Sequence, residues 1–464
     1  MSRPDTEHPT DALGLDVEQM RPLAHWVVDR VVDHFERIGE GPAIRTGSPT
    51  ELASALGGPA PEEPGDPLEA MQTLLDVALG NMQHGDHPRY FARVPGPSSI
   101  AGVLGEWLGT GFNAIAASWP GGSGPATAEV VAVDWLRSLL GMPEGTEGVL
   151  TSGGSLANMT GLLLARRSAG AGVAYLSDQT HASIRRGLLA IGFPPEHIRV
   201  LPSDEHLRLD PASLTSAIAE DRDASHRPGF VVATAGTTNS GAVDPLDALA
   251  DICSAEGLWL HVDGAYGAPA VLCPAGARAL AGIARADSLV VDPHKWLFQP
   301  YDIGCLLVRR PGALAETFTM TPEYLPAASG EPGAVDFRDR GLELSRRARG
   351  LKLWLSFRIY GVARMRAAIA RGMELAEYAQ SVLEADSRWE LVTPAQLGIV
   401  TFASVAGTAQ DHAARAAALG RDGYAALTTT TLHGRSVLRL CTINPLTTEH
   451  DIASTLDRLA AVVP

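Results

Sequence analysis

The chain has 464 residues, of which 45% are hydrophobic and 19% charged, an ordinary composition for a globular protein. Its 53 acidic and 37 basic side chains give a net charge of -16, which argues against nucleic acid or an anionic membrane as a partner because both attract basic surfaces. The first residues lack the apolar core of a signal peptide, and no apolar run of roughly eighteen residues occurs, so we expect a cytoplasmic protein without a membrane span. Four cysteines without Cys-x-x-Cys spacing predict buried thiols rather than a disulfide frame or zinc site, and we expect no metal.

Apolar residues recur every three or four positions over residues 16–37, a spacing that predicts an amphipathic helix. The stretch 57–67 is rich in glycine and proline and predicts a linker, so the helix has no obvious partner nearby in the sequence. We expect its apolar side to pack on another subunit, which would make residues 1–85 a helical dimerisation segment. Packing against the core of its own chain is the alternative.

From residue 87 the chain enters a turn-rich segment, 87–99, whose aromatic and basic side chains are typical of a loop that lines a site. Helices are expected at about 100–117 and 125–140, and from about 148 short apolar strands alternate with helices. Strands are predicted at 148–151, 173–176, 198–201, 230–234, 258–262, 288–291 and 304–309, and helices at 155–167, 183–191, 211–219 and 245–256. This alternation predicts an α/β fold with a mostly parallel central sheet, in which ligands bind at the carboxyl ends of the strands.

The C-terminal part of the chain has a different pattern. Residues 311–350 lack firm periodicity and predict a long loop. Helices are expected at 351–360, 362–385, about 410–420 and after the cap Thr448, with strands at 397–402 and 436–440. We therefore expect a large α/β domain over 86–360 and a smaller α+β domain over 361–464.

Lys295 follows the apolar strand predicted at 288–291. Strand interiors disfavour lysine, and a desolvated lysine loses its proton more readily and attacks carbonyl groups. Lys295 is therefore a candidate for a Schiff base with pyridoxal phosphate. An isolated lysine at this place would more often only cap the strand. The residues at the other strand ends therefore decide between a cap and a Schiff base.

Four further strand ends carry groups that suit the same cofactor. The turn Thr151-Ser-Gly-Gly-Ser155 offers free amides and glycines for a phosphate, and His181 can stack on an aromatic ring and move protons. Thr238 adds a hydroxyl, while the carboxylate of Asp263 needs a cationic partner such as a protonated pyridine nitrogen, whose charge makes the ring an electron sink. Each has a simpler interpretation alone, a cap or a surface histidine, but with Lys295 they indicate one cofactor site.

Five motifs then carry a resemblance to a known family. With them the chain resembles the group II pyridoxal-phosphate-dependent decarboxylases, the family of aromatic-L-amino-acid decarboxylase, from about residue 16 to its end. The resemblance implies pyridoxal 5'-phosphate as cofactor and a homodimer of fold type I with intertwined N-terminal segments and active sites at the subunit interface. The motifs are Thr-Ser-Gly-Gly-Ser at 151–155, Ser-Asp-Gln-Thr-His at 177–181, Gly-Thr-Thr at 236–238, His-Val-Asp-Gly-Ala-Tyr at 261–266 and Asp-Pro-His-Lys-Trp-Leu at 292–297.

The resemblance also implies roles for individual residues. Lys295 would form the Schiff base, Asp263 would pair with the pyridine nitrogen, and His181 would stack on the ring and contact the substrate. Tyr324 looks like the proton donor to the substrate carbon after carbon dioxide leaves, although it could instead be a loop anchor. Tyrosine there favours plain decarboxylation, whereas relatives with phenylalanine tend to form aldehydes. The remaining cofactor contacts would come from Gly154, Ser155, Thr238, Ala265, Asp292 and His294.

Two departures from the family pattern leave the substrate open. Leu156 stands where many relatives carry glutamate, and Arg93 and Val94 stand where the aromatic decarboxylases carry aromatic side chains in the substrate-lining segment, which continues through Pro95 and Gly96. Arg93 either binds an acidic or hydroxylated side chain or points to solvent.

The expected function is decarboxylation of an L-amino acid, with an aromatic or related bulky side chain, to the amine. Oxidative decarboxylation and deamination to an aldehyde, or action on an acidic or diamino acid, are the alternatives. A catalytically silent homologue is a further alternative, against which the presence of Lys295, Asp263, His181 and Tyr324 argues.

Overall fold

The computed structural model describes residues 15, 17–170, 172–320 and 331–462. Its centre is a seven-stranded sheet with the strand order β1-β7-β6-β5-β4-β2-β3. Strands β3, β2, β4, β5 and β6 pair in parallel, while β7 runs antiparallel to β6 and to β1. The predicted mostly parallel sheet is thus confirmed. Its strands are β1 (Glu147–Thr151), β2 (Val173–Ser177), β3 (Ile198–Leu201), β4 (Pro228–Thr234), β5 (Trp259–Asp263), β6 (Ser288–Val291) and β7 (Gly304–Val308).

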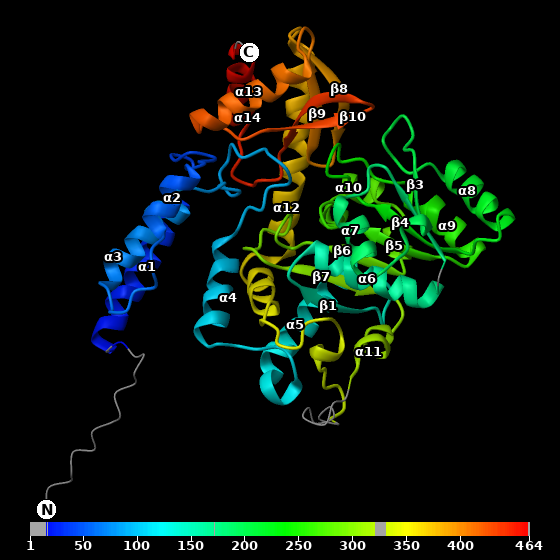
Figure 1. The fold of residues 1–464 in the computed structure, drawn as a ribbon, viewed down its shortest axis with the longest axis horizontal. Coiled ribbons are helices and arrows are strands. Elements are labelled where there is room, and N and C mark those ends of the chain that lie inside the picture. The colour runs from blue at the N-terminus through cyan, green and yellow to red at the C-terminus, as the bar shows by residue number, and fades with distance from the viewer. Residues whose placement is uncertain (1–14, 16, 171, 321–330, 463–464) are drawn as a thin grey trace, which may run out of the picture.

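Helices cover both faces of this sheet. Successive residues of a strand point to opposite faces, so each strand contributes side chains to two cores. In β4, Val231 and Ala233 join a core with helices α5 (Trp119–Leu139), α8 (Pro211–Asp223) and α9 (Leu246–Glu256). The alternate residues Phe230 and Val232 join a core with α6 (Gly154–Ala169) and α7 (Ala182–Ala190). Figure 1 shows the resulting three-layer arrangement, with the sheet between its helices.

A second, antiparallel sheet with the order β10-β11-β9-β8 forms the C-terminal unit. Its apolar face packs on helices α12 (Gly350–Ala385), α13 (Ala409–Asp422) and α14 (Glu449–Ala461). The strands are β8 (Trp389–Gln396), β9 (Ile399–Ser404), β10 (Thr428–Leu432) and β11 (Arg435–Cys441), of which β8 and β10 were not predicted. The predicted α+β unit is present, and the cap of α14 is the expected one, since Thr448 accepts from the amide of Asp451.

The division into domains at residues 85 and 360 stays a prediction. α12 spans the second of these positions as one element, but Gly361 has non-helical dihedral angles (φ 68°, ψ 161°). This break lies where the sequence predicted two separate helices.

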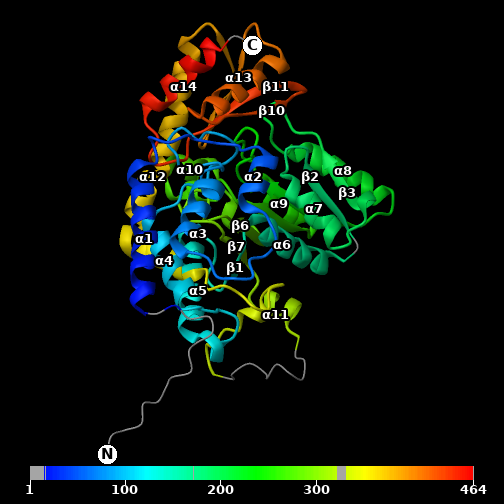
Figure 2. The same cartoon turned by 60° about the vertical axis from the view of Figure 1, so that its left-hand side comes forward.

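The N-terminal arm consists of α1 (Val17–Arg37), α2 (Pro49–Leu56) and α3 (Pro67–Thr73), which continues as a π-helix, Leu74–Leu79. In Figures 1 and 2, α1 lies at the outer edge of the molecule, on the same side as α4 (Ile100–Gly111). No residue of α1 is buried, so its predicted apolar stripe has no full covering within the described chain. α4 ends at Gly111, six residues before the predicted end at 117, and Phe112 caps it.

The stretch 311–350, predicted as a long loop, is only partly one. Helix α11 (Ala313–Phe318) lies within it, and Phe337 and Arg346 are buried at 1% and 3% exposure. Those two side chains anchor the second half of the stretch to the large sheet unit. Within the part of the chain that is described, no helix combines the length and the apolar character needed to cross a bilayer.

Candidate active site

A cavity of about 720 Å³ opens at the carboxyl ends of the parallel strands. Every residue predicted to contact the cofactor lines it, although these residues lie up to 141 positions apart in the chain, from Gly154 to Lys295. The parallel strands bring them together because their carboxyl ends meet at one edge of the sheet. The predicted residues on its wall are Arg93, Val94, Gly154, Ser155, His181, Thr238, Asp263, Ala265, Asp292, His294 and Lys295.

The turn between β1 and α6 forms one wall of this cavity. Gly153 has a φ of 135°, a backbone conformation that L-residues with a side chain rarely adopt. A Cβ at Gly154 would lie 2.7 Å from Asp292 Oδ2, so glycine is needed for the close approach of the two segments. The first amides of a helix have no intrahelical acceptor, so Gly154 and Ser155 can donate to an anion in the cavity.

Lys295 lies beside two carboxylates. Its Nζ is 2.9 Å from Asp292 Oδ2. Burial by itself lowers the pKa of Lys295, but attraction from Asp292 and then Asp263 outweighs burial and raises the pKa above its usual value. The neighbouring carboxylates thus oppose the loss of the proton that desolvation alone would favour. A cationic group beside Asp263 would cancel part of this attraction and favour the neutral amine.

His294 flanks Asp292 on the other side. Its Nδ1 accepts from the amide of Ile303 at 3.3 Å, and its Nε2 is 3.6 Å from Asp292 Oδ2. Burial lowers the pKa of His294, so the ring is neutral with its proton on Nε2, toward the carboxylate. Asp292 Oδ1 is buried and has no hydrogen-bond partner among the described residues, which leaves it able to accept from a bound molecule.

Asp263 ends a chain of buried polar side chains that the sequence argument missed. Asn158 Nδ2 donates to Asp263 Oδ2 at 3.0 Å, and the amide of Ala265 donates to Oδ1 at 3.1 Å. Behind Asn158, its Oδ1 is 3.0 Å from His261 Nε2. His261 Nδ1 is 2.7 Å from Ser288 Oγ, which accepts from Trp259 Nε1 at 2.8 Å.

Only one placement of protons satisfies all five side chains in this series of hydrogen bonds. The ionised carboxylate requires the amide nitrogen of Asn158, so the amide oxygen faces His261 and Nε2 of His261 must donate. His261 Nδ1 must then accept from the hydroxyl of Ser288. Burial lowers the pKa of His261 to about 4, which agrees with a neutral ring. Every donor in this series therefore points toward Asp263, whose Oδ2 accepts from Asn158.

His181 caps helix α7 and faces the cavity. The amide of Ser183 donates to His181 Nδ1 at 3.3 Å, and the Ser183 hydroxyl lies 2.8 Å from the same nitrogen. Because Nδ1 accepts, the neutral ring carries its proton on Nε2, the nitrogen left for a bound molecule.

The segment predicted to contact the substrate is fixed by a buried arginine. Arg93 has a φ of 50°, and its carbonyl oxygen accepts a short hydrogen bond from Arg439, which is 2% exposed. Arg93 and Val94 line the cavity, and Arg93 is also exposed, so both alternatives for its side chain stay open. A Cβ at Gly96 would lie 2.4 Å from the hydroxyl of Tyr301, and Pro95 is buried beside it.

Tyr301 also lines the cavity and was not predicted from the sequence. Its ring lies 4.7 Å from that of His294, centroid to centroid. The available signal was an aromatic residue six positions after Lys295 in a turn that follows Pro300. Tyr324, predicted as the proton donor, lies outside the described residues.

The lining fits pyridoxal phosphate. The cavity presents an amine for the aldehyde carbon, an ionised and braced carboxylate for the ring nitrogen, helix amides for the phosphate and a buried carboxylate oxygen without a partner.

Comparisons with known proteins agree with this geometry. Residues 49–405 match the family model of the pyridoxal-dependent decarboxylase conserved domain. The chain is 42% identical to an aromatic-L-amino-acid decarboxylase of Bacillus atrophaeus, over 98% of this chain and 97% of the relative, and 34% identical to tyrosine decarboxylase 2 of Narcissus pseudonarcissus, over 94% and 92%. The crystal structure of Oryza sativa TDC with PLP and tryptamine superposes with a TM-score of 0.91 at 30% identity, covering 96% of this chain and 97% of the other.

Proposed function

Because the chain belongs to the pyridoxal-dependent decarboxylase family, we propose that it releases the α-carboxyl group of an aromatic L-amino acid as carbon dioxide and leaves the amine. Its cofactor is pyridoxal phosphate, which when bound supplies an electron sink for the electron pair left on the α carbon. The observation that carries the proposal is the meeting of Lys295, Asp263 and His181 in one cavity. The aromatic side chain of the substrate is supported by the activities named for the similar proteins.

Each of these three side chains has a distinct task in the proposal. Asp263, braced by Asn158 and the amide of Ala265, accepts the N–H of the ring nitrogen and keeps that nitrogen protonated. Lys295 would hold the cofactor through its aldehyde carbon and would give up that place to the substrate amine. His181 covers the ring and holds a proton on Nε2 that can reach the substrate.

The proposed proton donor to the α carbon is Tyr324. The support for it is its place in the stretch Met320-Thr-Pro-Glu-Tyr324, which follows helix α11. A phenol at this position returns a proton to carbon, and the product is then the amine rather than an aldehyde.

The assembly proposed is a homodimer whose subunits meet through the N-terminal arm and α4. Apolar side chains on these helices are widely exposed in the single chain, including Val17 at 68%, Leu108 at 55% and Phe112 at 83%. Apolar surface of this extent on one side of a chain is typical of an interface. A cytoplasmic location is supported by four free, buried cysteines, as expected in a reducing compartment.

A substrate panel tests the proposal. The holoenzyme is supplied separately with L-tryptophan, L-tyrosine, L-phenylalanine, L-glutamate and L-2,4-diaminobutyrate, and carbon dioxide and amine are both quantified. We expect an aromatic acid to have a kcat/KM at least ~10-fold above the acidic and diamino acids, since a misfitting side chain loses roughly 1–3 kcal/mol of binding. Preference for glutamate or the diamino acid would overturn the aromatic assignment.

A further inference from the structure

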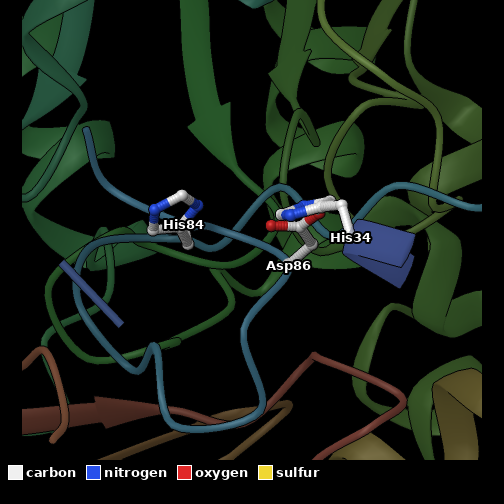
Figure 3. A group of neighbouring side chains, drawn as sticks. All are labelled: His34, His84 and Asp86. Atoms are coloured by element: carbon white, nitrogen blue, oxygen red, sulfur yellow. The ribbon is translucent and has the colours of Figure 1, made fainter. Parts of the chain in front are cut away.

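Three side chains that commonly bind metals meet where the N-terminal arm joins the rest of the chain. His34 lies in the last turn of α1, and His84 and Asp86 lie on the loop that passes beside it (Figure 3). Their nitrogen and oxygen ligand atoms all lie within 4.8 Å of one another. Among the described residues, no other group of three or more histidine, cysteine, aspartate or glutamate side chains has this spacing.

The three side chains are already close and reachable from solvent. His34 Nε2 is 3.2 Å from Asp86 Oδ2, and the rings of His34 and His84 lie 5.9 Å apart at an angle of 43°. The side chains of His34 and Asp86 are 42% and 17% exposed, so an ion can enter without unfolding.

The loop that carries two of the ligands is held in place from behind. The amide of His84 donates to the carbonyl oxygen of Ala43 at 3.0 Å. Asn444, 1% exposed, donates to the carbonyl oxygens of Asp86 and His87, both at 2.9 Å. The fold thus positions the backbone that carries His84 and Asp86.

We propose that His34, His84 and Asp86 bind one divalent transition-metal ion of the Zn²⁺ type. Two imidazole nitrogens and one carboxylate oxygen are ligands that Zn²⁺ prefers, whereas Ca²⁺ and Mg²⁺ prefer oxygen alone. Tetrahedral Zn²⁺ sites keep ligand atoms roughly 3.3 Å apart, a spacing that the His34–Asp86 pair already has, and all the ligand atoms of the group lie within 4.8 Å of one another. Solvent would complete the coordination.

The surroundings of the site shift the pKa values of His34 and His84 in opposite directions. The hydrogen bond that His34 donates to Asp86 raises the pKa of His34, so an ion must displace a proton there. Burial lowers the pKa of His84, an effect that Asp86 opposes and that His34 and Arg45 reinforce. The chain as a whole carries a net charge of -16, which attracts a cation.

Such an ion would fasten the arm to the rest of the chain. α1 has no buried residue of its own, and the loop with His84 and Asp86 runs on to Arg93 and Val94 at the cavity. The site is independent of the proposed decarboxylation, and its test does not use activity.

The test is zinc binding by the full-length holoenzyme after treatment with a chelator. Calorimetric titration with ZnCl₂ and elemental analysis by mass spectrometry are expected to give a single tight site per chain. His84→Ala and Asp86→Asn are expected to weaken it at least ~10-fold, because each removes a direct ligand. His25→Ala, which removes an exposed histidine from the same helix but outside the group, is expected to bind zinc like the parent.

Two further measurements keep the proposal testable if a variant fails to fold. Cobalt bound to the unaltered protein is expected to show the visible absorption of a nitrogen- and oxygen-ligated ion. Zinc is also expected to raise the melting temperature of the parent and not of Asp86→Asn. The proposal is overturned if the parent takes up no zinc at about 1 mM free ion, which corresponds to negligible affinity, or if His84→Ala and Asp86→Asn bind zinc as tightly as the parent.

Discussion

Asp263 depends on residues that never touch the cavity. His261 and Ser288 are both fully buried and stand behind Asn158, and their hydrogen bonds orient the amide that the carboxylate accepts from. The motif containing Asp263 predicted the carboxylate itself. The motif could not predict the hydrogen-bonded side chains beyond Asp263. Asn158 lies on a helix 105 residues earlier, and only the folded sheet brings Asn158 and Asp263 together.

We expect His261→Leu to weaken binding of pyridoxal phosphate about 10- to 100-fold, since lost hydrogen bonds to a charged group are worth about 1.5–3 kcal/mol. The substitution leaves Asn158 without its partner, so the amide no longer holds Asp263. Cofactor affinity is measured by titrating the apoenzyme and following the visible absorption band. His412→Leu, which removes a buried histidine in the C-terminal unit, is the control, and unchanged affinity in folded His261→Leu would refute the role.

His87 makes the stability of the protein depend on pH. Burial, reinforced by Arg89, lowers the pKa of His87 to about 4. Its Nδ1 accepts from the amide of Arg89 and its Nε2 donates to the carbonyl oxygen of Gly41, a pattern that only the neutral ring can make. Between pH 6.5 and 4 the unfolded chain therefore binds more protons than the folded one, so stability falls as pH falls through this range.

We expect this histidine to remove about 2 kcal/mol of stability between pH 7.5 and pH 5. His87→Asn keeps an acceptor for the Arg89 amide but does not titrate, so its stability should decline less over the same range. Urea unfolding of both proteins at pH 7.5 and pH 5 measures the difference. Parallel declines would show that His87 is not the group responsible.

At the scale of elements, a buried ion pair joins α5, β1 and the stretch before α12. The side chains of Arg346 and Glu129 are 1% and 0% exposed, with Nη2 of Arg346 2.7 Å from Glu129 Oε1. Arg346 also donates to the carbonyl oxygens of Ala116 and Leu150, while the amide of Leu150 donates to Glu129. The pair therefore holds in place a stretch that the sequence predicted only as a loop.

Glu129→Gln is expected to destabilise the protein by about 3–5 kcal/mol, because it leaves the charge of Arg346 buried without a counter-charge. The exposed pair Arg435–Glu390 provides a matched comparison, with side chains 45% and 49% exposed. Glu390→Gln should change stability by only about 0–1 kcal/mol in the same denaturation experiment. Equal losses in the two variants would contradict this account of the element.

Strands and helices of the large sheet were predictable because each carries its own apolar period. The predicted runs 173–176 and 288–291 fall within one residue of β2 and β6. β10 was missed because its run of four threonines has no apolar alternation, and β8 because Pro394 interrupts it, and both strands are specified by pairing with neighbours. Cavity residues at strand ends were predictable because the apolar run of each strand marks where the strand ends. Tyr301 lies on a turn, so no such run pointed to it.

At the scale of the whole molecule, the apolar residues that α1 exposes in the single chain are the support for the proposed dimer. Val28 is 40% exposed in the single chain, and a charge there would be buried in the proposed dimer. We expect the parent to sediment as a dimer and Val28→Glu to weaken the dimer at least ~10-fold. Glu36→Lys, which changes charge on the same helix at an exposed polar position, is the control. A parent that is monomeric at micromolar concentration would contradict the assembly.

The products of a labelled substrate distinguish plain decarboxylation from the formation of an aldehyde. The holoenzyme is given its preferred aromatic L-amino acid carrying ¹³C in the carboxyl group, and every product is quantified by mass spectrometry. The account predicts labelled carbon dioxide and unlabelled amine in equal amounts, with no aldehyde. Aldehyde with ammonia and hydrogen peroxide, or amino acid consumed without release of labelled carbon dioxide, would contradict it.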